Sequence, residues 1–204
     1  MKYLIAPALI ALALATAAQA ETRNLTGFDG VGAADKIDVY VTQGEGFRVE
    51  VTGRDAARVR TEVSDGNVLQ ISSRSRSWWG GTPDLDATVR VTMPAIENLA
   101  AAKGATLTAT NIRAGNLDLA AAMGAELDVS GTCSRVDITA AMGASVDAEH
   151  LICNEADVSA SMGADIELNA TQSFDASASM GASVNNSGAG AARDVSASMG
   201  ASVN

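Results

Sequence analysis

The segment LDLAAAMGAELDV, residues 117–129, decides the fold class, because altered copies of it follow four more times along the chain. Every copy keeps a Met-Gly-Ala triplet, and a further copy upstream reads Lys103-Gly104-Ala105. The glycines of successive triplets lie 18 to 20 residues apart. A repeat of this length is typical of a solenoid, in which each copy forms one coil stacked on the previous coil. The complete triplets begin at Met123, Met142, Met162, Met180 and Met199.

Apolar and polar residues alternate on both sides of each triplet. Leu117, Leu119 and Ala121 share one parity, and Asp118 and Ala120 fall between them. This alternation indicates strands, because successive side chains leave a strand on opposite faces. Helical repeats need roughly thirty residues or more and a different period. The sequence therefore predicts an all-β fold, a parallel β-solenoid with coils of about 19 residues.

The methionines share the parity of the apolar residues, so we expect them to point into the core. A short coil encloses a thin core, and the unbranched methionine side chain fits irregular gaps between alanines. The glycine after each methionine is expected either to let the strand bend or to adopt a positive φ at a corner. A row of methionines that binds a ligand such as copper(I) is the alternative to core packing.

Residues 1–20 have the form of a cleaved signal peptide. Lys2 supplies a positive charge, residues 4–18 are apolar, and Ala18-Gln19-Ala20 forms a small-x-small cleavage site. No later segment is apolar over a sufficient length to span a bilayer as a helix. We therefore expect a mature chain without a membrane span, in the periplasm, secreted or at the cell surface.

The part before the repeats also has strand patterns and is expected to belong to the same single domain. Residues 21–97 are assigned to an irregular N-terminal β cap, and residues 98–204 to the repeat solenoid. Within the cap, Gln43-Gly44-Glu45-Gly46 predicts a hairpin turn between strands at 36–42 and 47–51. A cap covers the apolar core and the unpaired strand edges at the end of a solenoid.

Cys133 and Cys153, the two cysteines of the chain, each precede a repeat glycine by ten residues. They are therefore expected at the same position on adjacent coils, close enough for a disulfide. An exported compartment favours that bond, and two stacked, buried thiols are the alternative. Two cysteines and a single histidine make a poor set of ligands for a metal such as zinc.

Several segments resemble a known protein family. They read FDGV at 28–31, IDVYVTQG at 37–44, VLQI at 68–71 and VRVTMP at 89–94, with Leu99 and Gly104 beyond. The chain from about Phe28 onward resembles the putative auto-transporter adhesin head domain, the GIN domain. This resemblance implies a right-handed, β-helix-like solenoid and a role in adhesion, and it brings no catalytic residues to transfer.

Composition and motifs argue against two classes of function. The formal net charge of −10 argues against nucleic acid as a partner. His150 is the only histidine, Glu149 beside it is expected on the opposite face of a strand, and no nucleophile elbow, phosphate loop or zinc motif occurs. We therefore expect no enzyme. A polysaccharide-acting enzyme with paired carboxylates on a strand face is the least favoured alternative.

Two columns of acidic residues are expected on outward faces of the coils. Asp128, Asp147 and Glu167 are candidates for a low-affinity calcium site, because carboxylate and carbonyl oxygens suit this ion. Solvated aspartates that keep sheets from associating are the preferred alternative, and no other cofactor is indicated. The second column contains Asp118, Asp137, Asp157, Asp175 and Asp194.

The segment RSRSWWGG, residues 74–81, is basic and aromatic in an otherwise acidic chain. Arg74, Arg76, Trp78 and Trp79 are the candidate ligand-binding residues, because indole rings beside guanidinium groups suit a sugar ring or an anionic envelope polymer. The alternative is that both tryptophans fold back over the open end of the solenoid.

Together these features favour an exported, non-catalytic β-solenoid that acts as an adhesin or binding module at the cell envelope. Its expected partner is an envelope polysaccharide or another cell-surface component. The alternative is a structural envelope protein that forms homo-oligomers. Its contacts would be the C-terminal coil, which lacks an evident cap, or a flat face of alanine, serine and glycine between the acidic columns.

Overall fold

The computed structural model describes residues 20–64, 67–74 and 85–204, and strands are the main secondary structure in these ranges. Within these ranges fifteen strands form one continuous sheet, and one 3-10 turn, η1 (Ala56–Arg58), lies between β4 and β5. No α-helix occurs in these ranges, and hence none that is long and apolar enough to cross a membrane. The strands are β1 (Glu21–Arg23), β2 (Gly30–Ala34), β3 (Asp38–Gln43), β4 (Arg48–Thr52), β5 (Val59–Val63), β6 (Val68–Ser73), β7 (Thr88–Met93), β8 (Asn98–Ala102), β9 (Thr106–Ala122), β10 (Glu126–Ala141), β11 (Ser145–Ser161), β12 (Asp165–Ala178), β13 (Ser183–Asn186), β14 (Ala191–Ala197) and β15 (Ser202–Val203).

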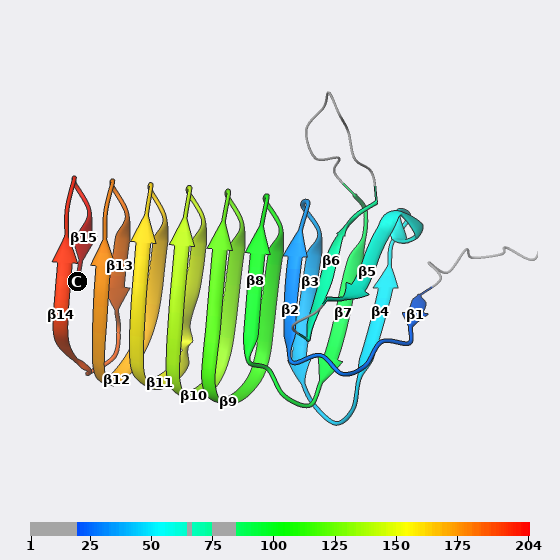
Figure 1. Ribbon diagram of the computed structural model, residues 1–204, viewed down its shortest axis with the longest axis horizontal. Coiled ribbons are helices and arrows are strands. Elements are labelled where there is room, and N and C mark those ends of the chain that lie inside the picture. Colours follow the sequence, from blue (N-terminus) through cyan, green and yellow to red (C-terminus); the bar gives the residue numbers. More distant parts are fainter. Residues whose placement is uncertain (1–19, 65–66, 75–84) are drawn as a thin grey trace, which may run out of the picture.

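The sheet is wound into a parallel β-solenoid with two walls, which confirms the predicted fold class (Figure 1). The long strands β9 to β12 each bend once, so that their first residues lie in one wall and their last residues in the other. In the first wall the order is β1-β4-β7-β3, then β9 to β13, then β15. In the second wall β5, β6, β2 and β8 precede the far halves of β9 to β12, and β14 follows.

Each Met-Gly pair forms a tight turn between the walls, at the upper edge in Figure 1. Met123 has φ 55° and Gly124 has φ 68°, and the N–H of Ala125 donates to the C=O of Ala122 at 3.3 Å. Positive φ at both central residues is characteristic of a type I′ turn. The expectation that the methionines fill the core is therefore wrong. The four inner ones are 45–47% exposed and Met199 is 72% exposed.

The parity of a two-residue turn explains this error. Ala121 and Ala125 flank the turn and are both buried, because two turn residues leave the alternation of the strands unchanged. A period-2 count therefore continues through Met123 as if the strand did not end. The expected positive φ of the glycines is confirmed, and the methionines share it.

The core lies between the two walls and consists of in-register columns of apolar side chains. One column in the first wall contains Leu107, Leu127, Val146, Ile166 and Val184, and one in the second contains Leu119, Ile138, Val158 and Ala176. All of these are buried. Burial of a valine, leucine or isoleucine side chain contributes about 1.5–3 kcal/mol to the stability of the fold relative to exposure. Each coil is therefore stabilised by packing against the coils on either side of it.

The edge of the solenoid opposite the Met-Gly turns carries a covalent link between coils. Cys133 and Cys153 lie in register on β10 and β11 and form a disulfide, with 4.6 Å between their Cα atoms. Beside them, Gly131 has φ 144°, and a Cβ at this position would lie 2.2 Å from the C=O oxygen of Ile112. Only glycine allows the adjacent coils to approach so closely here.

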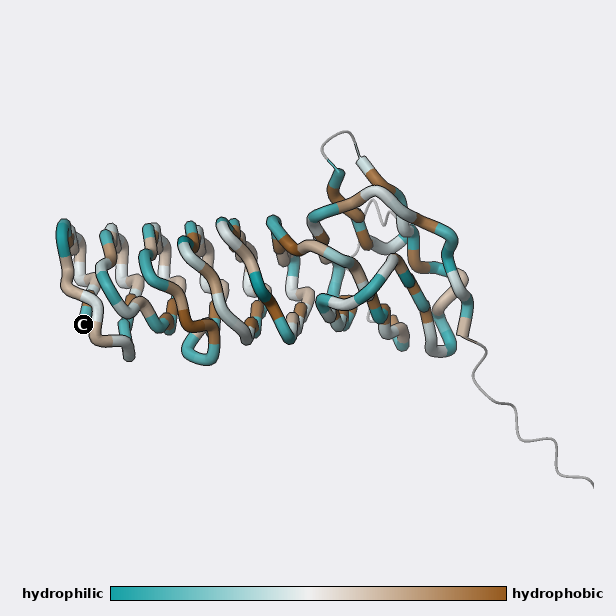
Figure 2. The backbone as a smooth tube through the Cα atoms, turned by 90° about the horizontal axis from the view of Figure 1, so that it is seen from below, coloured by the Kyte–Doolittle hydropathy of each residue, from teal (hydrophilic) through white to brown (hydrophobic). Residues whose placement is uncertain are grey.

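The N-terminal strands extend both walls, partly in antiparallel sense. The predicted hairpin at residues 43–46 is wrong, because β7 lies between β3 and β4, parallel to β3 and antiparallel to β4. On the second wall β5 and β6 form an antiparallel pair. Seen from below, the repeat coils follow one another along the long axis, with the N-terminal strands at the other end from the C-terminus (Figure 2).

Candidate functional site

The predicted ligand-binding segment begins at the end of β6. Arg74 is exposed, and its backbone N–H donates to the C=O of Arg58 at 2.8 Å. The other three candidates, Arg76, Trp78 and Trp79, lie outside the described residues. The structure therefore describes Arg74, at the start of this segment, and the residues from Leu85 onward, which follow it.

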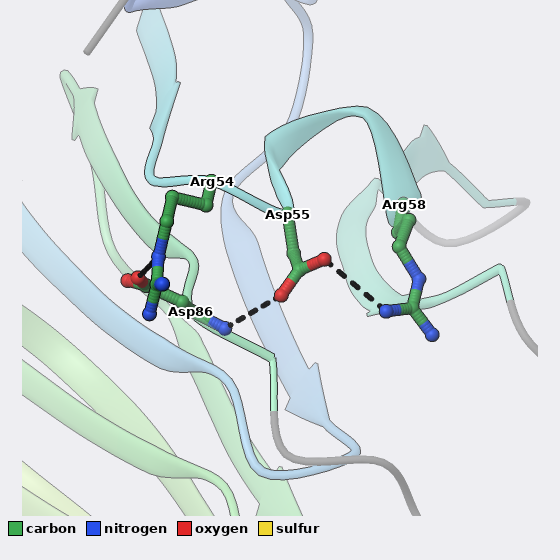
Figure 3. Close-up of polar contacts among 4 residues, drawn as sticks. All are labelled: Arg54, Asp55, Arg58 and Asp86. Atoms are coloured by element: carbon green, nitrogen blue, oxygen red, sulfur yellow. Dashed lines mark hydrogen bonds and ion pairs between the residues drawn. The ribbon is translucent and has the colours of Figure 1, made fainter.

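Four charged residues connect η1 to the residues that lead into β7 (Figure 3). The Arg54 side chain pairs with the carboxylate of Asp86 at 2.5 Å. Asp55 accepts the backbone N–H of Asp86 at 3.1 Å and pairs with Arg58 at 3.1 Å. Since the C=O of Arg58 also accepts the N–H of Arg74, the same corner contacts a described residue before residues 75–84 and another, Asp86, after them. We call Arg54, Asp55, Arg58 and Asp86 the clamp.

Hydrogen bonds within the clamp shift the pKa of two of its groups. The backbone N–H of Asp86 lowers the pKa of Asp55 below its ordinary value, and the Arg58 guanidinium adds to this effect. The Asp86 carboxylate raises the pKa of Arg54. The clamp therefore contains ionised side chains of both signs across the neutral range.

A second group of charged and aromatic side chains lies on the outward face of the first wall, across β4, β7 and β3. Glu50 is in register with Arg90, and Arg90 is in register with Tyr40. The Arg90 guanidinium lies over the Tyr40 ring, 5.7 Å from its centroid, and Tyr40 is 46% exposed. Together with Thr42, Arg48 and Thr92, these residues line a shallow hollow of about 350 Å³. We call these six residues the Tyr40 patch.

The charges of the Tyr40 patch are held by ion pairing. Arg48 pairs with Glu50 at 2.6 Å across two positions of the same strand. This contact lowers the pKa of Glu50 and raises that of Arg48, so both groups stay charged near neutral pH. The hollow thus presents an aromatic face, a guanidinium stacked on it, a carboxylate and threonine hydroxyls. Such groups can contact the apolar face of a sugar ring and hydrogen-bond to its hydroxyls.

Reasoning from the sequence missed the Tyr40 patch. The signal was present, because Tyr40 and Arg90 occupy outward positions of two alternating strands. Their strands are about fifty residues apart in the chain, however, and the expected hairpin placed β4 next to β3. The insertion of β7 between these strands brings the side chains together.

The row that contains Tyr40 continues along the first wall as a row of acidic residues. Tyr40 is in register with Thr108, which is followed by Asp128, Asp147 and Glu167 on β10, β11 and β12. The structure therefore places the calcium candidates in one outward row. All three are exposed.

One of these acids also belongs to a cluster that includes the histidine. Ligand atoms of Asp147, Glu149 and His150 lie within 4.8 Å of one another, and all three residues are exposed. Glu149 does not point away from His150 as expected, because the ladder between β11 and β12 is irregular between Ala148 and Ile152. Carboxylate and imidazole groups are ligands for divalent ions, although exposed acids commonly cluster without one.

The second wall carries the other acidic column and the flat face. Asp118, Asp137, Asp157, Asp175 and Asp194 are in register on successive coils. Glu155 pairs with Arg135 and Arg193 at 3.4 and 3.3 Å, which places cations beside this column. The flat face follows at Ala120, Thr139, Ser159 and Ser177, which are likewise in register and exposed.

Comparison with known proteins identifies the family. The model of the family described as "Putative auto-transporter adhesin, head GIN domain" matches residues 27–190. Similar solved structures include a putative adhesin from Bacteroides fragilis, with a TM-score of 0.71 and 15% identity over 93% of this chain and 97% of that one. A putative lipid binding protein from Parabacteroides distasonis gives a TM-score of 0.53 and 17% identity, with coverage of 93% and 97%.

No curated protein matches the chain significantly. Identities of 15–17% show the fold alone, whereas the family match covers most of the sequence. The resemblance inferred from the residues is thereby confirmed. The chain belongs to the family of putative auto-transporter adhesins with a head GIN domain.

Proposed function

We propose that the protein is an exported, non-catalytic binding module that attaches to an envelope polysaccharide or another cell-surface component through the Tyr40 patch. The observation that carries this proposal is the Arg90 guanidinium stacked on the exposed Tyr40 ring beside the Arg48–Glu50 pair. An exposed aromatic ring with fixed polar partners suits recognition of sugars better than catalysis. Membership of an adhesin family supports the same role.

The backbone around the patch supports binding without rearrangement. The patch lies on three hydrogen-bonded strands whose opposite faces are buried in the core, for example at Val39, Val49 and Val91. Side chains on such a sheet are positioned before the ligand arrives, which lowers the entropic cost of binding. The acidic row begins two strands beyond Tyr40, so an anionic polymer would contact the N-terminal end of the wall and be repelled further along it.

The segment with Arg74, Arg76, Trp78 and Trp79 is the proposed second contact of the ligand. In the sequence it precedes β7, the strand that carries Arg90, and Arg58 and Asp55 of the clamp bind Arg74 before it and Asp86 after it. Export through cleavage of residues 1–20, and location in the periplasm, outside the cell or at its surface, are parts of the same proposal.

Binding to purified envelope polysaccharides tests this function. The chain from Glu21 would be compared with Tyr40→Ala/Arg90→Ala, with Trp78→Ala/Trp79→Ala, and with Ser145→Ala as a control on the same wall. We expect saturable binding that is weakened by more than about tenfold in the Tyr40/Arg90 variant and unchanged in the control. Equal binding by all variants, with circular dichroism showing intact strands, would contradict the assignment to the patch.

Thermal unfolding with and without calcium tests the proposed calcium site in the acidic row. A calcium ion held by Asp128, Asp147 and Glu167 would raise the melting temperature, because an ion that binds only the folded state stabilises it. An unchanged melting temperature would leave these residues as solvated surface groups.

Self-association within the envelope is the second candidate function. One observation favours it: all seven residues of β14 are exposed, and within the described residues this strand pairs only with β12. An open strand edge is a template for pairing with another chain. The C-terminal coil or the flat face would then form the contact. Sedimentation that changes with protein concentration would support this role, and a concentration-independent monomer would contradict it.

A further inference from the structure

The exposed methionines form a continuous row along one edge of the solenoid. In each turn except the last, the glycine N–H donates to the C=O of the methionine in the next coil, as from Gly124 to Met142 and from Gly143 to Met162, at 3.1 Å. These bonds fix neighbouring methionine Cα atoms at the spacing of adjacent strands, about 4.8 Å. We call Met123, Met142, Met162, Met180 and Met199 the methionine row.

The turn itself does not require methionine. The five methionines have φ values of 50–56°, in a region that favours glycine and asparagine over larger side chains. Lys103 occupies the same position one coil earlier with φ 55°, so the geometry accepts a long polar residue. Each methionine of the row also exposes an apolar side chain to water. Backbone preference and exposure both disfavour methionine here, so the property that distinguishes it at this position is the chemistry of its sulfur.

Thioether sulfur is a soft ligand with a preference for soft ions such as copper(I). The side chain has three rotatable bonds, so two or three neighbours in the row can bring their sulfur atoms together around one ion. Exposed carboxylates of Glu126 and Asp165 follow two of the turns, and the chain is acidic as a whole, which favours a cation. Lys103, in contrast, places a positive charge at one end of the row.

We propose that the methionine row binds a soft monovalent cation, copper(I) or silver(I), through the sulfur atoms of Met142, Met162 and Met180, with Met123 and Met199 extending the site. The parity of the methionines does not imply burial, because they lie in two-residue turns and not within strands. The oxygen-rich surfaces of the two walls suit hard ions instead, so the row is chemically distinct from them. This proposal does not depend on the proposed binding function.

Silver(I) is the probe for the test, because it resembles copper(I) as a soft ion and does not require reducing conditions. The full chain would be titrated with silver nitrate in chloride-free buffer by calorimetry. A variant with leucine at all five positions keeps the size and apolar character of the row and removes its sulfur. Met93→Leu is the matched control, because Met93 is the buried methionine of β7.

We expect the parent chain and Met93→Leu to bind silver(I) alike, and the five-leucine variant to bind more than about tenfold more weakly. Binding that survives in the five-leucine variant, or its absence from the parent chain, would overturn the proposal. If that variant fails to fold, the parent chain decides alone through its methionine methyl resonances. Silver(I) should then shift the signals of the row and leave Met93 unchanged, and a titration without shifts in the row would contradict the proposal.

Discussion

Truncation of a methionine in the row tests where the structure places these side chains. Met142 is 47% exposed, so slightly more than half of the surface of this residue is covered. Full burial of a methionine contributes about 1.5–3 kcal/mol, and Met142→Ala should therefore cost about 1 kcal/mol. Met142→Asn should cost less, because asparagine tolerates a positive φ and recovers part of this loss.

Met93→Ala is the matched comparison. Met93 is 0% exposed, and truncation of a core methionine costs about 2–5 kcal/mol. Thermal unfolding followed by circular dichroism measures the difference, since 1 kcal/mol shifts the melting temperature of a chain of this size by about 2–4 °C. We expect a fall of about 2–4 °C for Met142→Ala and at least about 4 °C for Met93→Ala. Equal losses at the two positions, or a larger loss for Met142→Asn than for Met142→Ala, would refute the turn assignment.

Three further changes have defined outcomes. Simultaneous replacement of Cys133 and Cys153 by alanine should lower the free energy of unfolding by about 3 kcal/mol, because their disulfide closes a segment with a sequence separation of 20 residues. Urea titration measures this free energy, and an unchanged unfolding midpoint would contradict the disulfide. Gly131→Ala should lower the free energy of unfolding by at least about 2 kcal/mol in the same titration, since the new Cβ would clash with the C=O of Ile112. An unchanged free energy of unfolding would contradict the need for glycine at this close contact between coils. Asp55→Asn should destabilise the clamp at neutral pH. The pKa of Asp55 is lower in the folded state, so the ionised Asp55 carboxylate stabilises the fold above its ordinary pKa, and this stabilisation is lost as the pH falls through the lower, folded-state pKa. The difference in melting temperature between Asp55→Asn and the parent chain should therefore narrow below about pH 4. A difference that does not depend on pH would contradict a stabilising role for the Asp55 carboxylate.

Local pattern explains most of what could be predicted of the fold. The period of the triplets and the alternation around them gave the parallel solenoid and the inward residues, because stacked coils repeat the same environment in every copy. Alternation cannot detect a two-residue turn, so the methionines were assigned to the core. Alternation indicates which residues share a face of a strand, but it does not indicate where the strand ends in a turn.

The candidate site was harder to predict, since its parts come from distant segments. RSRSWWGG is conspicuous within one stretch of sequence, whereas Tyr40, Glu50 and Arg90 meet only because β7 inserts between β3 and β4. Pairing of strands far apart in sequence depends on the whole packed structure and leaves no local mark. The clamp could not be predicted for the same reason, because Asp55 and Asp86 come from segments that are far apart in the sequence and meet only in the fold.

Mapping of ligand-induced chemical shift changes on the backbone amides tests the central claim most directly. The isotope-labelled chain would be titrated with an oligosaccharide fragment of whichever envelope polysaccharide it binds. Binding at the Tyr40 patch predicts the largest changes in β3, β4 and β7, around Tyr40, Glu50 and Arg90, with little change along the repeat coils. Changes centred on the second wall, or spread along β10 to β12 with none near Tyr40, would contradict it.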